Sequence, residues 1–158
     1  MNKAITSFLK AAILIMGLIV ALLCIFLLPG LAGDAAAENP EFAYLKWPVL
    51  LGMYAAAIPF YIALYESWKL LRYIEGQTAF SDFSVQSLRC IRNCGIALGL
   101  IYAAGIIGVG AAGALHPGVF LMGAAIAFCS FVISVFAAVL KELLRSALTM
   151  KNENELTI

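Results

Sequence analysis

The feature that most constrains this fold is a run of 48 residues, Asn93 to Leu140, that contains no Asp, Glu, Lys or Arg. As one helix the run would be about 72 Å long, more than twice the roughly 30 Å of a bilayer's hydrocarbon core. Pro117 cannot continue a helix, and Gly118 tolerates a turn. We therefore predict that the run folds back at residues 114–118 and forms two membrane helices.

Two shorter uncharged runs precede it, Ala11–Leu28 and Trp47–Tyr65, and each is long enough for one membrane helix. The chain is 64% hydrophobic and 12% charged, whereas soluble domains are roughly 45–50% apolar and 25% charged. This composition excludes a soluble enzyme and a disordered chain, and the net charge of +1 argues against direct nucleic-acid binding. We predict an all-α integral membrane four-helix bundle with helices near residues 8–28, 45–70, 90–114 and 118–146. The transmembrane domain would be residues 1–150, and residues 151–158 would form a C-terminal tail.

The basic residues predict the orientation of these helices. Nine of the ten lie in the two termini or in the second loop, and Lys46 alone lies on the other side. Under the positive-inside rule both termini are cytoplasmic. The expected outer loop, residues 29–46, carries three acidic residues instead.

The N-terminal segment has a second interpretation. Residues 1–28, followed by Pro29 and the alanines at 35–37, resemble a signal peptide with an A-x-A cleavage site. The apolar run is longer than the usual 7–15 residues of a signal peptide. A retained membrane helix is therefore favoured over cleavage.

An aromatic face on the second helix has two interpretations. Its residues are spaced by 4, 3, 4 and 3 positions, which places them on one side of a helix. The face either packs on neighbouring helices through its hydroxyls or forms a wall for a lipid, quinone or other apolar ligand, and packing is favoured. Pro59 lies in this helix and is expected to kink it. The face consists of Tyr54, Ile58, Tyr61, Tyr65 and Trp68, and its three tyrosines are the candidate ligand-binding residues.

Glycines recur along the third helix, beginning with Gly95-x-x-x-Gly99. Small residues let membrane helices approach closely. This helix is expected to be central, and it packs either within one chain, which is favoured, or across a dimer. The further glycines are Gly105, Gly108, Gly110 and Gly113.

Candidate residues for catalysis and metal binding are few in this sequence. Cys90 and Cys94 are one helical turn apart with no histidine nearby, because His116 lies at the opposite membrane face. Glu66 stands three residues from Lys69, which favours an interfacial ion pair over a proton-carrying carboxylate. Common hydrolase and phosphate-loop motifs are missing from the sequence. We expect no catalytic residue, no metal and no cofactor, and a transporter is disfavoured.

The connection between the second and third helices is rich in polar residues. One helix is expected to end at Glu75 with Gly76 as its C-terminal glycine, and the next to begin with Ser81 as N-cap after Phe80. Arg89 and Arg92 either bind anionic headgroups or reflect the positive-inside bias alone.

The C-terminal sequence predicts an end to the fourth helix near Met150, because Asn152 and Asn154 follow. The last three residues, Leu156, Thr157 and Ile158, then form either a frayed tail or a short extended peptide that docks on a partner.

We call the connection between the second and third helices the elbow. Together with the C-terminal ending, Glu153 to Ile158, it indicates a family. The elbow residues that carry the resemblance are Leu71, Ile74, Gly76, Phe80-Ser81, Leu88-Arg89, Ile91 and Gly95. With them the chain resembles the YoaS-like family of small bacterial membrane proteins, a family of unknown function. The resemblance implies a four-span protein of the bacterial inner membrane. It also implies a small helix-turn-helix regulator encoded nearby, and it supplies no catalytic residues.

Two functions follow from these observations. The first is a non-enzymatic membrane protein that binds a soluble partner, such as that regulator. The second is a module for binding, or assisting transport of, a lipid or apolar ligand. The oligomeric state is left open. The candidate partner-binding residues are Phe80, Ser81, Arg89, Arg92, Leu156, Thr157 and Ile158.

Overall fold

The computed structural model describes residues 2–157, and the regular structure within them is helical. Four helical segments are long and apolar enough to cross a membrane, which confirms the all-helical fold with four candidate spans. The main helices are α1 (Lys3–Leu22), α2 (Leu28–Glu38), α3 (Lys46–Glu75), α4 (Asp82–Ala111) and α5 (Pro117–Leu156), with a π-helical turn at Leu23–Leu27 and a 3₁₀ helix at Pro40–Leu45.

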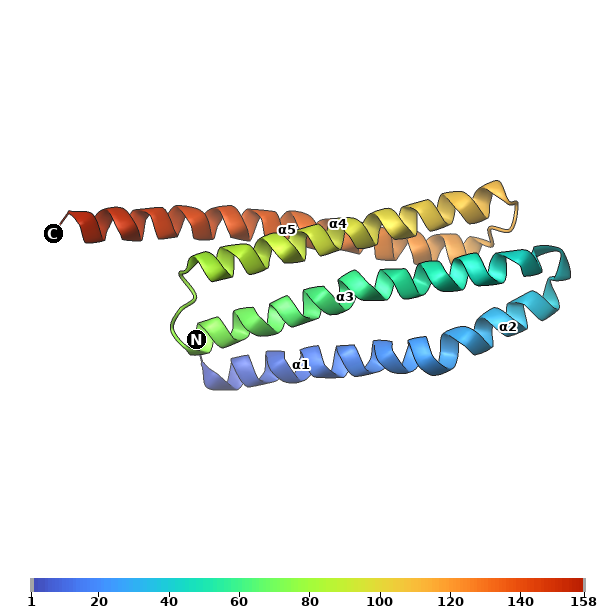
Figure 1. The fold of residues 1–158 in the computed structure, drawn as a ribbon, viewed down its shortest axis with the longest axis horizontal. Helices are drawn as coiled ribbons and strands as arrows, with labels where there is room; N and C mark the ends of the chain where they lie inside the picture. The colour runs from blue at the N-terminus through green and yellow to red at the C-terminus, as the bar shows by residue number, and fades with distance from the viewer. Residues whose placement is uncertain (1, 158) are drawn as a thin grey trace.

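The long helices lie side by side in chain order and run antiparallel to their neighbours (Figure 1). The α1 helix packs mainly on α3, α3 packs on α4, and α4 packs on α5. Both termini lie at one end of the molecule, which we call the termini end (Figure 1). The α4–α5 turn lies at the opposite end, which we call the turn end. Most large apolar side chains are exposed on the outside, as hydrocarbon surroundings require.

The closest helix contact is between α4 and α5. A Cβ atom at Gly95 would lie 2.9 Å from the carbonyl oxygen of Ser130, and one at Gly99 would lie 2.7 Å from the ring of Phe131. The buried face of α5 carries small residues at the facing positions, Ser130, Ser134 and Ala137 among them. The prediction of close glycine packing is therefore confirmed at Gly95 and Gly99, and the partner helix belongs to the same chain.

The turn at residues 114–118 is confirmed. The α4 helix ends at Ala111, Gly113 has a left-handed φ of 74°, and α5 begins at Pro117. His116 is the N-cap of α5, because its Nδ1 accepts the Gly118 N–H at 3.1 Å. A proline at the first helical position costs no hydrogen bond, which explains how Pro117 both ends one helix and starts the next.

The prediction of a loop at residues 29–46 is wrong. The first helical segment continues through the π-helical turn into α2 and ends only at Glu38, so the alanines at 35–37 are helical. Pro29 is tolerated within this continuous helix because the π-helical turn before it already departs from regular α-helical hydrogen bonding, so its missing N–H removes a single backbone bond.

The predicted end of the fourth helix near Met150 is also wrong, because α5 continues to Leu156. Asn152 and Asn154 lie within the helix. Asparagine lowers helix stability by less than about 1 kcal/mol per residue and does not block the backbone as proline does. Both asparagines are exposed, so neither side chain is forced into a buried position.

Candidate functional site

The connection between α3 and α4 is an ordered turn at the termini end. Gly76 is the C-cap of α3, but its φ is −79°, and the left-handed residue is Gln77 with a φ of 57°. The Thr78 N–H donates to the Tyr73 carbonyl at 2.8 Å and completes the end of the helix. The glycine predicted here is thus present at the cap, while glutamine takes the left-handed position that glycine more commonly occupies.

Ser81 is the N-cap residue of α4, as predicted, although its side chain does not cap the helix. Its hydroxyl donates instead to the carbonyl of Thr78 at 2.8 Å and lies 3.4 Å from the Ser84 hydroxyl. Ser81 therefore stabilises the turn between α3 and α4 through bonds within the turn. Phe80 precedes it, and its side chain is 57% exposed.

Two serines that the sequence analysis did not single out are almost fully buried at the start of α4. Ser84 and Ser87 are each 2% exposed. Their spacing of three residues places them on one helical face with Leu88 and Gly95, and this run of small residues was the available signal. Small side chains here allow α4 to pack closely on its neighbours from its first turn onward.

Lys141 is a second buried polar group that the sequence did not reveal. It is 7% exposed, and its ammonium group lies 3.3 Å from the carboxylate of Glu142. It extends the buried face of α5, in which Ser134, Ala137 and Lys141 are spaced by three and four residues. That periodicity could have placed Lys141 on the α4-facing side rather than among the surface charges.

The predicted partner-binding residues fall into two groups. Phe80, Ser81, Arg89 and Arg92 belong to the elbow and the first turns of α4. Arg89 is exposed, and Arg92 donates to the side-chain oxygen of Asn93 at 2.9 and 3.1 Å.

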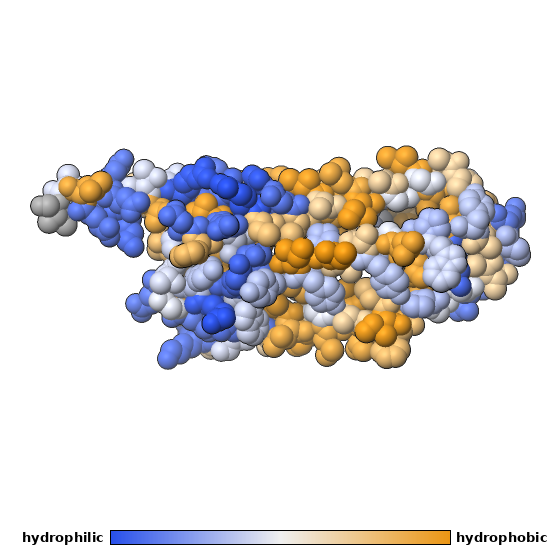
Figure 2. All heavy atoms as spheres, in the orientation of Figure 1, coloured by the Kyte–Doolittle hydropathy of each residue, from blue (hydrophilic) through white to orange (hydrophobic). Residues whose placement is uncertain are grey.

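The second group ends α5. Leu156 is 87% exposed, and Thr157 donates to the Glu153 carbonyl at 2.6 Å. Ile158 lies outside the described residues. The last turns of α5 extend past the ends of the other helices (Figure 1), and hydrophilic residues gather at this end of the molecule (Figure 2).

Two of the three candidate tyrosines of α3 face the N-terminal helical segment, one at α1 and one at the π-helical turn after it. The Tyr61 hydroxyl donates to the Gly17 carbonyl at 2.7 Å, and the Tyr54 hydroxyl donates to the Cys24 carbonyl at 2.8 Å. A third contact between the same helices continues the pattern: the Lys10 ammonium lies 5.3 Å from the centre of the Trp68 ring. The two helices thus meet every seven residues, at Lys10 with Trp68, Gly17 with Tyr61, and Cys24 with Tyr54.

Tyr65 differs from the other two tyrosines. Its ring is exposed and lies 5.3 Å from the ammonium of Lys69. Lys69 also pairs with Glu66 at 3.0 Å, which is the ion pair expected from the sequence. The hydroxyls of Tyr54 and Tyr61 are bonded to the π-helical turn and to α1, so of the three only Tyr65 presents most of its ring to the surroundings.

Metal-ligating residues do not cluster in the part of the chain that the structure describes, where no group of three or more His, Cys, Asp or Glu side chains is close enough to hold an ion. Cys90 is half-buried and Cys94 is buried, and all four cysteines are free thiols.

A cavity of about 410 Å³ lies between α3, α4 and α5, toward the turn end. None of the three candidate tyrosines lines it. This cavity was not predictable from the sequence, because the glycines of α4 that border it follow the same pattern as those that pack against α5.

These features define the class of protein: an all-helical membrane protein with four candidate spans and an apolar cavity among three of them. The family model described as "Protein of unknown function (DUF2975)" matches residues 30–158, and the chain belongs to this family. It is 43% identical over 160 residues to the uncharacterized membrane protein YoaS of Bacillus subtilis strain 168, with the whole of both chains covered. The resemblance seen in the sequence is confirmed. No solved structure matches the chain significantly.

Proposed function

We propose that this chain is a non-enzymatic protein of the bacterial cytoplasmic membrane that holds a small soluble helix-turn-helix regulator at the membrane. Both termini would then be cytoplasmic, as the distribution of basic residues favours. The observation that carries the proposal is the extension of α5, in which every residue from Thr149 to Thr157 is exposed. This helical extension is available to a partner outside the bilayer.

The chemistry of the extension suits such a partner. Met150 and Leu156 are exposed apolar side chains in a segment that lies beyond the apolar span. Glu153 and Glu155 outnumber the single Lys151, so the extension is acidic. DNA-binding regulators carry basic surfaces, which an acidic helix with exposed apolar residues complements.

The elbow offers a second contact at the same end. Phe80 and Phe83 are both exposed, and Arg89 lies two turns farther along α4. Aromatic and arginine side chains are the residue types that most often dominate binding energy at protein interfaces. A partner that contacts both the elbow and the α5 extension would gain from their fixed positions on rigid helices.

A co-purification experiment tests this proposal. The family resemblance implies that a small helix-turn-helix regulator is encoded nearby, and that regulator, once purified, is mixed with the full chain or with a chain that ends at Met150. We expect the truncated chain to recover much less regulator, and Asp34→Asn at the turn end to behave as the full chain. Equal recovery by the truncated chain would contradict the role of the extension.

The second candidate function is the binding of a lipid or other apolar ligand, or a related transport role. The cavity between α3, α4 and α5 favours it. Tyr61→Phe tests whether a ligand binds on the aromatic face of α3, as the sequence suggested. Unchanged ligand retention in native mass spectrometry would mean that the ligand binds elsewhere.

A further inference from the structure

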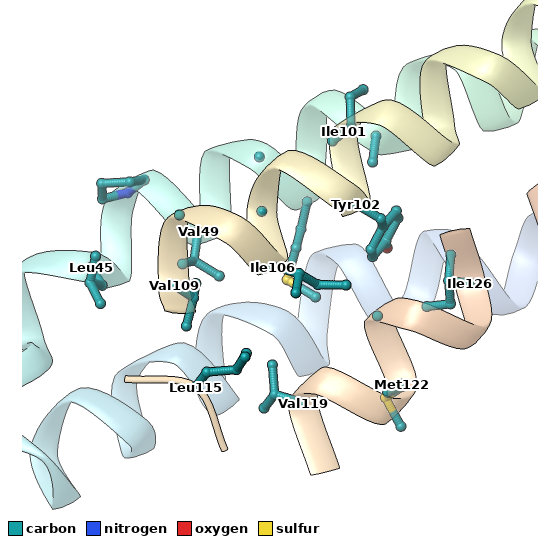
Figure 3. Close-up of a pocket in the computed structure, with 17 residues that line it drawn as sticks. Leu45, Val49, Ile101, Tyr102, Ile106, Val109, Leu115, Val119, Met122 and Ile126 are labelled. Carbon is teal, nitrogen blue, oxygen red and sulfur yellow. The ribbon is translucent and has the colours of Figure 1, made fainter. Parts of the chain in front are cut away.

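The cavity is lined almost entirely by apolar groups. Its residues come from the start of α3, the second half of α4, the α4–α5 turn and the start of α5 (Figure 3). Among the lining side chains, only Tyr102 carries a hydroxyl, and there is no charge. Water has too few polar partners there to be stable, so the cavity suits an apolar occupant.

Three lining glycines keep the cavity open. A Cβ atom at Gly52, Gly105 or Gly108 would meet nothing within 4 Å, in contrast to Gly95 and Gly99. None of the three has a positive φ, since the left-handed glycine among the described residues is Gly113. A glycine inside a helix costs about 1 kcal/mol relative to alanine. Neither packing nor backbone geometry offsets this cost at the three positions, and what the missing side chains provide is free volume.

The cavity is elongated along the helices. Its lining runs from Leu45 to Ala56 on one side and from Ile101 to Val109 on α4. At 1.5 Å per residue these stretches are about 16 and 12 Å long. An apolar space of that length, parallel to the membrane helices, matches a linear hydrocarbon chain better than a compact ring system.

The surroundings supply such a chain. Val119 and Met122 line the cavity and are also largely exposed on the apolar surface of α5. The cavity is therefore continuous with the surface that faces hydrocarbon. Leu45 and Leu115 line it too, and each adjoins a polar residue of the turn end, Lys46 or His116. A lipid headgroup can lie at that end while its chain enters between the helices.

We propose that the cavity binds one acyl chain of a glycerophospholipid from the leaflet at the turn end. The site holds the chain beside α4, with Gly52, Gly105 and Gly108 providing the space. It is separate from the partner contact at the termini end and deepens the second candidate function.

Native mass spectrometry of the full chain, released from phosphatidylethanolamine and phosphatidylglycerol vesicles, tests the site. The variant Gly105→Leu with Gly108→Leu fills the cavity, and Gly30→Leu is the matched control, because Gly30 also has open space around it but lies on α2. We expect the double variant to retain about tenfold less lipid than the original chain, which corresponds to about 1.4 kcal/mol of lost binding. Gly30→Leu should retain as much lipid as the original chain.

Two further measurements keep the result decisive. Helix content by circular dichroism shows whether the double variant folds, and Gly105→Ala with Gly108→Ala should give a smaller loss in the same direction. A chain ending at Met150 should retain lipid normally, which separates this site from partner binding. Equal retention by the filled and original chains would overturn the proposal.

Discussion

The Tyr54 hydroxyl donates a 2.8 Å hydrogen bond to the backbone carbonyl of Cys24, which lies in the π-helical turn after α1. In this turn the Leu28 N–H donates to Leu23, five residues back. The next donor in that register would be residue 29, which is a proline and has no N–H. Tyr54 thus satisfies a carbonyl that its own helix leaves without its usual donor, and it fixes α3 to the N-terminal segment at this point.

Tyr54→Phe should destabilise the docking of the N-terminal segment on α3. Interhelical hydrogen bonds in membranes are worth about 0.6 kcal/mol on average and up to about 1.7. We expect a loss in the upper half of that range, because the carbonyl would be left unsatisfied in an apolar setting. Reversible unfolding in mixed micelles measures the free energy.

Tyr61→Phe is the matched control. Its acceptor, the Gly17 carbonyl, lies in regular α-helix, where the N–H four residues later is available. The loss should therefore be smaller. In a Pro29→Ala background, residue 29 regains an N–H for Cys24, and Tyr54→Phe should cost less; a cost unaffected by Pro29→Ala would contradict this account.

Gly95→Ala should destabilise the α4–α5 contact by about 1–3 kcal/mol, the usual cost of forcing an extra group into a packed interior. The added methyl would press on the Ser130 carbonyl, a backbone atom that cannot rotate away. Gly105→Ala meets nothing within 4 Å and should be neutral or stabilising by up to about 1 kcal/mol. Thermal unfolding of both variants, compared with the original chain, measures the difference.

Lys10→Glu should weaken the packing of α1 on α3 at the termini end. Lys10 contacts both the Glu75 carboxylate and the Trp68 ring, so the reversal removes an ion pair and a cation–π contact. Both partners of the ion pair are partly exposed, so we expect a loss of only about 1 kcal/mol or less. Adding Glu75→Lys should restore the stability that the ion pair contributes, but not that of the cation–π contact. Hydrogen exchange of α1 amides measures the effect, and we expect slower exchange in the double variant than in Lys10→Glu. Faster exchange in the double variant would contradict the role of the ion pair.

The proposed orientation predicts which end is accessible from outside the cell. In a chain whose four native cysteines are replaced, His116→Cys should react with a membrane-impermeant maleimide in intact cells. Asn154→Cys should react only after the membrane is permeabilised. The reverse pattern would show that the termini end faces outward.

Much of this fold was predictable because it depends on local properties of the chain. The fold-back at Pro117 followed from the length of the uncharged run, and the end of α3 at Glu75 followed from the glycine after it. The Glu66–Lys69 pair followed from helical spacing alone. The ends of the first and last helices were predicted wrongly because Pro29 and the two asparagines have different effects at different helical positions, and the sequence does not state those positions.

The sequence by itself determined that the chain lies in a lipid bilayer, how many candidate spans it has, and that helices approach closely at Gly95. Hydrophobicity and side-chain size are properties of the residue itself and do not depend on its neighbours in space. Tertiary structure alone decided the role of each glycine and tyrosine. Gly95 meets a neighbouring backbone, whereas Gly105 borders open space, although both belong to the same pattern in α4. Tyr54 and Tyr61 bond to the N-terminal helical segment, whereas Tyr65 is exposed. The physical reason is that packing and cavities depend on the distance to another helix, and that distance is set by how all the helices pack together.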